Sequence, residues 1–458
     1  MRKSSIGKSD QGQTIVIYAL IVPILILFTG LAIDAGILYV TKAKLSTAVD
    51  GATLTGMKNL PSGHTTAAAL AADIFDANYG PNPPTPSITF PVDQYGDQQV
   101  QVTATAQVHT LFMRYLSQWR DVPVVDTAVA TRGKLVMSIV LDRSGSMTSD
   151  GGETALVSAV PTFVSMFDNT TDEVALLSFS SNARIDVPIG YNFTTPISNA
   201  VSSMVFTGGT FGTGAGTRAI QSATMGAPMS MADAQNNSVT VNPGQNVIRV
   251  LVYFTDGLMN ASQDTFYCGP SAPNTLLNYG GYDSGTTVSF LDPTCSPSAT
   301  GTGCTNESGH ISILDTCNNG CSSSTGFKYD AAGDICKNAS GGNVTTFLSQ
   351  QTGLQTAFTR ANVTAETQYR AIQTAYAMRT ETVPTYIFTM GLSTSVDPST
   401  AAFLAQLAND PNYPATFIPG QPAGEFFWIP NCPGATCTAD LTTAFQTIAS
   451  RVLLRLTQ

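Results

Sequence analysis

The feature that most constrains the fold is a pair of apolar runs, each of which stops abruptly at an acidic turn. Residues 135–141 are followed by Asp-Arg-Ser-Gly-Ser at 142–146, and residues 247–254 are followed by Thr-Asp-Gly at 255–257. Nearly continuous apolar runs of this length are typical of strands that are buried on both faces of a parallel sheet. Because the carboxyl ends of parallel strands meet at one edge, where ligands bind in open α/β folds, we expect the two turns to lie close together.

Apolar runs alternate with amphipathic segments through much of the chain after residue 133. Strands are expected at residues 134–142, 174–180, 184–189, 247–255 and 384–391. Helices are expected at residues 153–167, 195–204, 216–228, 364–380, 398–409 and 441–453. This alternation predicts an α/β domain with a doubly wound, mostly parallel sheet that helices cover on both faces.

The turn after the first buried strand carries the chemistry of a cation site. Asp142, Ser144 and Ser146 supply one carboxylate and two hydroxyl groups in one short segment. Hard oxygen donors of this kind suit a hard cation such as Mg²⁺. The alternative is that these are ordinary turn and helix-capping residues, whose side chains bond only to nearby backbone groups.

Two further loops make this turn resemble a known site. Thr210 follows two glycines in a Gly-rich loop, and Asp256 follows the second buried strand. Together the three loops resemble the metal-ion-dependent adhesion site of von Willebrand factor A (vWA) domains, which have a Rossmann-like fold. The resemblance implies a Mg²⁺ or Mn²⁺ site with three hydroxyl and two carboxylate ligands, partly through water: Ser144, Ser146, Thr210, Asp142 and Asp256. Thr213 and Thr217 lie in the same Gly-rich loop and remain alternatives to Thr210.

A long apolar segment lies near the N-terminus. Residues 14–33 carry no charge, and as a helix they are long enough to cross a hydrocarbon core of about 30 Å. The preceding Arg2, Lys3 and Lys8 predict, by the positive-inside rule, a cytoplasmic N-terminus with the rest of the chain exported. The helical pattern continues beyond the segment, which favours a retained single-pass anchor in an inner membrane. A signal peptide cleaved at the small residues 30–32 is the alternative.

The segment from residue 11 to residue 56 carries a second resemblance. Its apolar helix contains Pro23, continues past Asp34 and reaches Asp-Gly-Ala at 50–52. It resembles the N-terminal segment of TadG-like tight-adherence (Tad) pilus-assembly proteins, in which a membrane helix runs on to an Asp-Ala-Ala-like motif; the glycine is a small departure. Ile17 stands where a pilin-type processing signal would have glutamate, which argues against a processed pilin subunit. A generic membrane anchor is the alternative.

The cysteines are clustered in the C-terminal half of the chain. Their even number and loop-like surroundings indicate disulfides in an oxidising compartment, in agreement with export. A zinc site that uses Cys317 and Cys321 is the alternative. The spacing of Cys432 and Cys437 suggests a local disulfide loop. The eight residues are Cys268, Cys295, Cys304, Cys317, Cys321, Cys336, Cys432 and Cys437.

Shifts in pattern divide the chain into three parts. Residues 1–58 form the cytoplasmic start, the membrane helix and its periplasmic continuation, and residues 60–132 form a small α+β module. In that module, helices are expected at 66–75 and 111–116 and strands at 98–108 and 124–131. Residues 133–458 form the vWA domain, with a Cys-rich insertion at about 258–363 that shows no strong period.

Composition argues against two classes of function. The net charge of −10 and a charged fraction of only 11% are unlike those of proteins that bind nucleic acid. The three histidines are remote in sequence from the acidic turns, and the chain has neither a hydrolase nucleophile elbow nor a phosphate-binding glycine loop. We therefore predict that the protein is not an enzyme.

The implied ligand set predicts the kind of partner. Only two of the five ligands are charged, so a bound cation keeps positive character and attracts an incoming carboxylate. We expect the site to bind an acidic residue of a protein partner. The two resemblances together imply a membrane-anchored component of tight-adherence pilus assembly, with other pilus-assembly components as partners. A secreted or surface vWA adhesin that binds a host or matrix protein is the alternative.

Overall fold

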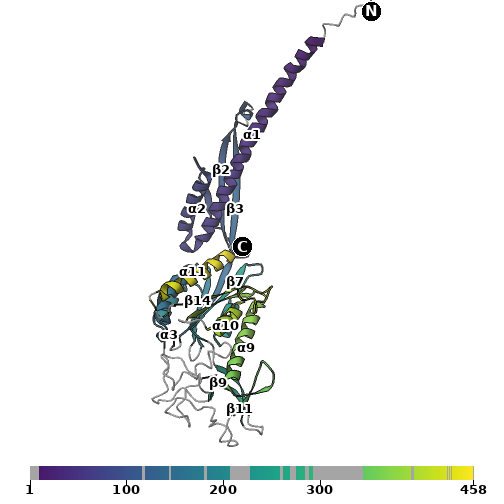
Figure 1. The fold of residues 1–458 in the computed structure, drawn as a ribbon. Coiled ribbons are helices and arrows are strands. Elements are labelled where there is room, and N and C mark those ends of the chain that lie inside the picture. Colours follow the sequence, from purple (N-terminus) through teal and green to yellow (C-terminus); the bar gives the residue numbers. More distant parts are fainter. Residues whose placement is uncertain are drawn as a thin grey trace, which may run out of the picture. The chain divides into compact units, whose positions relative to one another are not determined.

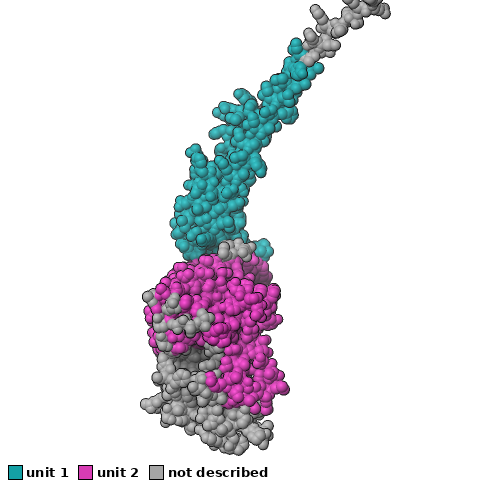
Figure 2. Space-filling model, viewed as in Figure 1, with its two compact units in different colours: residues 1–132, 457 teal, residues 133–456, 458 magenta. Residues whose placement is uncertain are grey.

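The chain folds into two compact units, which Figure 2 distinguishes by colour: residues 1–132 with 457, and residues 133–456 with 458. Each unit has a hydrophobic core of its own. The structure is a computed structural model, and it describes residues 10–115, 119–143, 146–179, 183–206, 227–257, 261–268, 275–283, 288–291, 344–392, 397–430, 432, 434 and 436–456.

The first unit is built on one long helix, α1 (Asp10–Lys58), whose two halves have different surroundings. In the N-terminal half the large apolar side chains are exposed, and the helix projects beyond the rest of the unit (Figure 1). Its most apolar 18-residue window has a mean hydropathy of 2.7 and is only 6% buried, so by length and composition this half can cross a membrane. In the C-terminal half, side chains such as Leu45, Val49 and Ala52 are fully buried.

The C-terminal half of α1 packs against a helix and a small antiparallel sheet. The helix is α2 (His64–Tyr79), and the strands lie in the order β1 (Ser87–Thr89), β2 (Gln98–His109) and β3 (Asp121–Arg132). Side chains of β2 alternate between the core and the surface, as expected for a strand that is buried on one face. Lys42 of α1 forms an ion pair of 2.7 Å with Asp126 of β3, which fixes the helix on the sheet.

The link between β2 and β3 differs from the sequence-based expectation. A helix was expected at residues 111–116, but its described part is a single 3-10 turn, η2 (Met113–Tyr115). The carboxylate of Asp34 accepts the backbone N–H groups of three consecutive residues that start at Leu111. A long-range contact therefore holds the link as a tight turn.

The second unit contains a six-stranded sheet with the order β14-β13-β7-β4-β5-β6. All neighbouring strands are parallel except β5 and β6, which pair antiparallel. The doubly wound, mostly parallel α/β fold predicted from the sequence is confirmed. The strands are β4 (Lys134–Asp142), β5 (Glu173–Phe179), β6 (Ala183–Val187), β7 (Val247–Thr255), β13 (Thr385–Leu392) and β14 (Glu425–Ile429).

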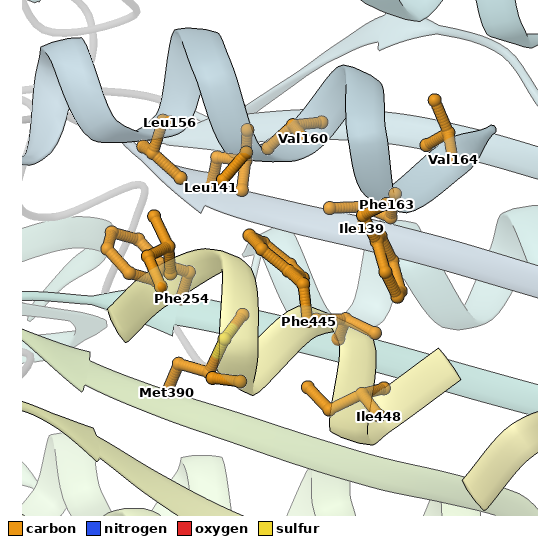
Figure 3. Packing of buried hydrophobic residues seen from close by; sticks show 14 of the residues in the cluster. Ile139, Leu141, Leu156, Val160, Phe163, Val164, Phe254, Met390, Phe445 and Ile448 are labelled. Carbon is orange, nitrogen blue, oxygen red and sulfur yellow. The ribbon is translucent and has the colours of Figure 1, made fainter. Parts of the chain in front are cut away.

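Helices cover both faces of this sheet. On one face lie α4 (Gly152–Val164), α5 (Thr194–Ser202) and α11 (Cys437–Leu456); on the other lie α7 (Ala227–Ser238), α9 (Arg360–Arg379) and α10 (Pro398–Ala408). Ile139 and Leu141 of β4 point toward α4 and α11 (Figure 3), whereas Val140 belongs to the core on the opposite face. Phe163 and Phe445 join the two helices, with ring centroids 4.6 Å apart.

The predicted Cys-rich insertion contains regular structure that its sequence did not reveal. Part of it forms an antiparallel sheet with the order β10-β9-β8-β11-β12. Two further elements, α7 and β14, were not expected either, and most of the helix expected at 216–228 lies outside the described residues. The strands of the antiparallel sheet are β8 (Ala261–Cys268), β9 (Thr275–Asp283), β10 (Val288–Leu291), β11 (Val344–Leu348) and β12 (Gln355–Ala357).

Candidate metal site

The candidate site begins where two neighbouring strands end. β4 and β7 are parallel, and Leu141 pairs with Phe254, so the next residues on each strand, Asp142 and Thr255, lie at the same edge of the sheet. The hydroxyl group of Thr255 donates a hydrogen bond of 2.7 Å to Oδ2 of Asp142. Both side chains are buried, with 4% of each exposed. The Asp142 carboxylate is therefore held in a fixed position at the carboxyl edge.

Asp256 adds a second carboxylate beside the first. Burial and the charge of Asp142 raise the pKa of Asp256 well above its ordinary value, and the charge of Asp150 acts in the same direction. A hydrogen bond from the hydroxyl group of Ser146 opposes this effect. Ser146 opens the short helix α3 (Ser146–Ser149), so β4, α3 and the end of β7 each bring one polar group to the same place.

One oxygen atom of this cluster has no hydrogen-bond partner among the described residues. Oδ2 of Asp256 is buried and accepts no hydrogen bond from any residue that the structure describes. A buried carboxylate oxygen without a hydrogen bond, beside a second carboxylate, is unfavourable by itself. A divalent cation would supply the missing interaction and offset the repulsion between Asp142 and Asp256. The donor set present in the structure therefore fits a cation site.

Carboxylates alone do not complete such a site. No group of three acidic, histidine or cysteine side chains with metal-binding geometry occurs within the described part of the chain. The remaining ligands of a cation would have to be hydroxyl groups, backbone oxygens or water. Hydroxyl groups are the additional donors that the sequence predicts.

The structure brings together three of the five residues predicted as ligands: Asp142, Ser146 and Asp256. Ser144 and Thr210 lie outside the described residues, as do the alternatives Thr213 and Thr217. The assignment of all five residues as metal ligands stays a prediction.

Two polar residues at the site were missed by the sequence reasoning. Thr255 supports Asp142, and its position at the end of a buried strand, next to Asp256, was the available signal. Asp150 contributes negative charge near Asp256. Its spacing of four residues from Ser146 indicated proximity, because residues four apart lie on the same side of a helical turn.

A buried arginine links the loop after β4, which contains part of the candidate site, to the neighbouring strand β5. Arg143 is fully buried, although it directly follows Asp142. Its Nε atom donates a hydrogen bond of 3.1 Å to the hydroxyl group of Ser178, and its backbone N–H donates one of 2.8 Å to the carbonyl oxygen of Phe179. Both partners belong to β5, so the loop after β4 is tied to the neighbouring strand.

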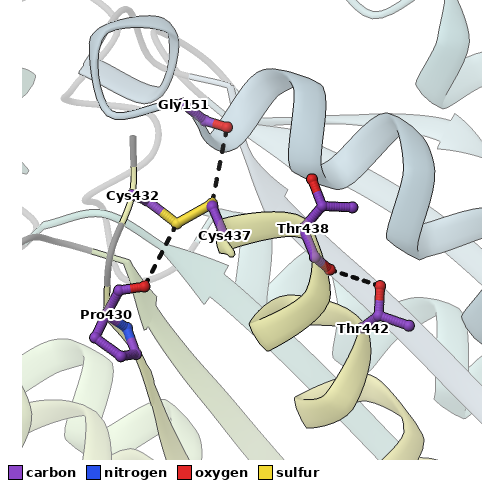
Figure 4. The surroundings of a disulfide bond; sticks show 6 residues. All are labelled: Gly151, Pro430, Cys432, Cys437, Thr438 and Thr442. Carbon is purple, nitrogen blue, oxygen red and sulfur yellow. Dashed lines mark hydrogen bonds between the residues drawn. A yellow bond between two sulfur atoms is a disulfide. The ribbon is translucent and has the colours of Figure 1, made fainter. Parts of the chain in front are cut away.

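A disulfide lies close to the end of the same loop. Cys432 and Cys437 are bonded to each other, as the sequence suggested, at the start of α11. Figure 4 shows this bond beside Gly151, whose carbonyl oxygen is 4.0 Å from Sγ of Cys437. The side chains of the other six cysteines lie outside the described residues, so their oxidation stays a prediction.

Two segments of the chain match models of known protein families. Residues 137–274 match the von Willebrand factor type A domain model, and this range includes all five predicted ligands. The chain contains a vWA domain. Domains of this family often bind a metal ion. Residues 12–59, which fall almost entirely within α1, match the model of putative Flp pilus-assembly TadE/G-like proteins.

Comparisons with solved structures give weaker likenesses to this vWA protein. The PilB minor pilin from Streptococcus sanguinis is 12% identical, with a TM-score of 0.38, and the match covers 81% of this chain and 78% of that one. The vWF domain of the type V pili tip protein Mfa5 from Porphyromonas gingivalis is 13% identical, with a TM-score of 0.38 and coverage of 72% and 98%. No curated protein matches the sequence at a significant level.

Proposed function

We propose that this protein is a membrane-anchored component of tight-adherence pilus assembly. Its vWA domain binds Mg²⁺ or Mn²⁺ at Asp142, Ser144, Ser146, Thr210 and Asp256, and through this ion it binds an acidic residue of a protein partner. The observation that carries the proposal is the buried Oδ2 atom of Asp256, which accepts no hydrogen bond from the described residues, beside the fixed carboxylate of Asp142.

The chemistry of the donors supports the choice of ion and of partner. Carboxylate and hydroxyl oxygens are hard donors, which favour Mg²⁺ and Mn²⁺ over softer metals. With two charged ligands, the ion has capacity left for one more anionic oxygen. A carboxylate of another pilus-assembly component would complete its coordination shell and make the contact dependent on the metal.

Contacts within the first unit support a retained anchor. The ring of Phe112 packs on α1 at Gly30, where an added Cβ would lie 2.5 Å from the ring. Gly30 is the first of the small residues at which a signal peptide would be cleaved, so cleavage there would remove part of the packed unit. We propose that α1 stays in an inner membrane, with a cytoplasmic N-terminus and the vWA domain on the opposite side.

Calorimetric titration of the full chain with Mg²⁺ and with Mn²⁺ tests the metal site. Asp142→Ala should weaken binding by more than about 100-fold, because loss of a direct ligand costs more than loss of a supporting residue. Glu381→Gln is the matched control, since it removes one negative charge before the start of β13, at the opposite edge of the sheet. Equal affinity in Asp142→Ala and Glu381→Gln would refute the assignment.

Crosslinking in intact cell envelopes, with and without a chelator, tests the partner. We expect the chelator and Asp142→Ala to remove the same crosslinked species, and Glu381→Gln to retain them. If the same species persist in the presence of the chelator, the metal has no part in the contact.

A further inference from the structure

A second feature of the first unit is the contact between Asp34 of α1 and the turn that links β2 and β3. Asp34 is the first charged residue after the apolar half of α1, and only 1% of its side chain is exposed. Its two carboxylate oxygens accept backbone N–H groups of Leu111 at 2.7 Å, Phe112 at 2.9 Å and Met113 at 2.6 Å. All three donors belong to the turn between β2 and β3. The end of this hairpin is thus bonded to the first charged residue that follows the uncharged residues 14–33 of the helix.

The turn reaches beyond this point into the apolar segment. Phe112 lies against Gly30, which is buried, and a Cβ at Gly30 would come within 2.5 Å of the aromatic ring. Gly30 precedes Asp34 by four residues, or about 6 Å along a helix. In Figure 1 the hairpin of β2 and β3 runs beside α1 and ends where the helix continues alone.

The side chains of the turn have the composition of a membrane interface. Among the described residues of the turn, four large apolar or aromatic side chains are exposed: Leu111 53%, Phe112 38%, Tyr115 87% and Trp119 44%. Tyrosine and tryptophan are enriched at membrane–water interfaces, because their rings are apolar and their polar groups face water. Exposed Arg114 and Arg120 lie beside them and carry the charge that anionic headgroups attract.

We propose that this turn, defined here as the tip (Leu111, Phe112, Arg114, Tyr115, Trp119 and Arg120), inserts into the interfacial layer of the membrane that α1 crosses. The inference rests on the proposed anchoring of α1. Its occupant is lipid, because Phe112 joins the exposed side chains of the tip to the apolar segment of α1 at Gly30, four residues before the first charged residue, Asp34. The tip fixes how deeply α1 sits, since the helix cannot slide without moving the hairpin.

Tryptophan fluorescence of the full chain tests the proposal. The chain has two tryptophans, Trp119 and Trp428, so Trp428→Phe leaves the tip as the only reporter. The protein is inserted into vesicles of phosphatidylcholine and phosphatidylglycerol whose acyl chains are brominated near the headgroup or near the chain end. We expect strong quenching of Trp119 by the shallow bromines, weaker quenching by the deep bromines, and protection from iodide in the water.

Two relocated tryptophans, each in a chain with both native tryptophans changed to Phe, serve as controls. Phe28→Trp is the membrane control, because it reports on the exposed apolar half of α1. Tyr95→Trp is the water control, because it reports on the turn before β2, at the end of the sheet away from the tip. Bromines should quench the membrane control, and iodide should quench the water control.

The outcomes separate the two proposals. If brominated lipids do not quench the fluorescence of the membrane control, the proposed anchoring of α1 is wrong. If the membrane control is quenched by bromines but Trp119 behaves like the water control, only the tip proposal fails. Protection of Trp119 from both quenchers would show a protein contact instead, and would also overturn the tip proposal.

Discussion

At the scale of single residues, the geometry of the candidate site depends on side chains that are not among the predicted ligands. The carboxylate of Asp142 is oriented by the hydroxyl group of Thr255, and the loop behind it is tied to β5 by Arg143. Groups of this kind set the geometry of metal ligands and are themselves sensitive to substitution. The positions of the predicted ligands therefore depend on the side chains of Thr255 and Arg143 as well as on the ligands themselves.

Removal of the Thr255 hydroxyl group should weaken cation binding without removing a ligand. Thr255→Val keeps the shape of the side chain but leaves Oδ2 of Asp142 without this donor. We expect an affinity for Mg²⁺ about 10-fold lower by calorimetry, in line with losses at other supporting residues. Thr389→Val is the matched control, because it removes a buried hydroxyl group that donates 2.8 Å to the carbonyl oxygen of Leu404. A similar loss in both variants would mean that the effect is general destabilisation.

The sequence predicts the positions of the two carboxylates better than those of the residues that support them. Asp142 and Asp256 were expected to lie together because each follows a long apolar run, and parallel strands bring such ends together. Arg143 and Asp150 were not, because their roles depend on a buried path to β5 and on the turn of α3. Local sequence carries little information on contacts of that kind.

A titrating aspartate on α7 should make stability depend on pH. Burial and the charge of Glu381 raise the pKa of Asp233 to about 6, while Arg249 opposes them. The folded chain then binds this proton more tightly than the unfolded chain, so the free energy of unfolding falls as pH rises from about 4 to about 6. Asp233→Asn should therefore stabilise the protein at pH 7 by about 1 kcal/mol, after allowance for solvent screening of a half-buried group, and have little effect near pH 4.

Chemical denaturation at the two pH values measures this difference. In a Glu381→Gln background the gain from Asp233→Asn should shrink, because one cause of the raised pKa is gone. A gain of equal size at both pH values would contradict the titration of Asp233.

At the scale of elements, the predictable strands are those with long apolar runs on both faces. The central strands β4 and β7 were expected with the bounds that the structure has, because a central parallel strand must be apolar throughout. β14 lies at the edge of the sheet and has only five residues, most of them half-buried, so its pattern is weak. The antiparallel strands that begin with β8 lie in Gly-, Asn- and Thr-rich sequence, where pairing between distant segments decides the structure.

The disulfide at the start of α11 should contribute measurably to the stability of this element. It closes a short loop from Cys432 to Cys437, at a sequence separation of 5, and the chain-entropy model assigns such a loop about 2 kcal/mol. Cys432→Ser combined with Cys437→Ser should lower the free energy of unfolding of the second unit by about that amount. The core contact of Phe445 with Phe163 should persist, so the near-UV circular dichroism of the folded variant should match the original. Unchanged stability would mean that the bond does not measurably lower the conformational entropy of the unfolded chain.

At the scale of the whole molecule, the segment proposed as the anchor and the site proposed for recognition belong to different compact units. The apolar half of α1 and the sheet that supports it belong to the first unit, and the carboxylates of the candidate site belong to the second. Each unit has its own hydrophobic core, so we expect a substitution in one core to leave the packing of the other core intact.

The two activities should therefore separate by mutation. Asp142→Ala should abolish chelator-sensitive crosslinking to partners while the protein stays in the membrane fraction after carbonate extraction. A variant with two charges in the apolar half of α1, Leu20→Lys with Leu27→Lys, should leave the membrane fraction, because each charge at the centre of a bilayer costs about 3 kcal/mol. Its vWA domain should still bind Mg²⁺ with the original affinity in calorimetry, since none of the predicted ligands lies in α1. Loss of the Asp142→Ala protein from the membrane, or loss of Mg²⁺ binding in the charged-helix variant, would show that the two units do not act independently.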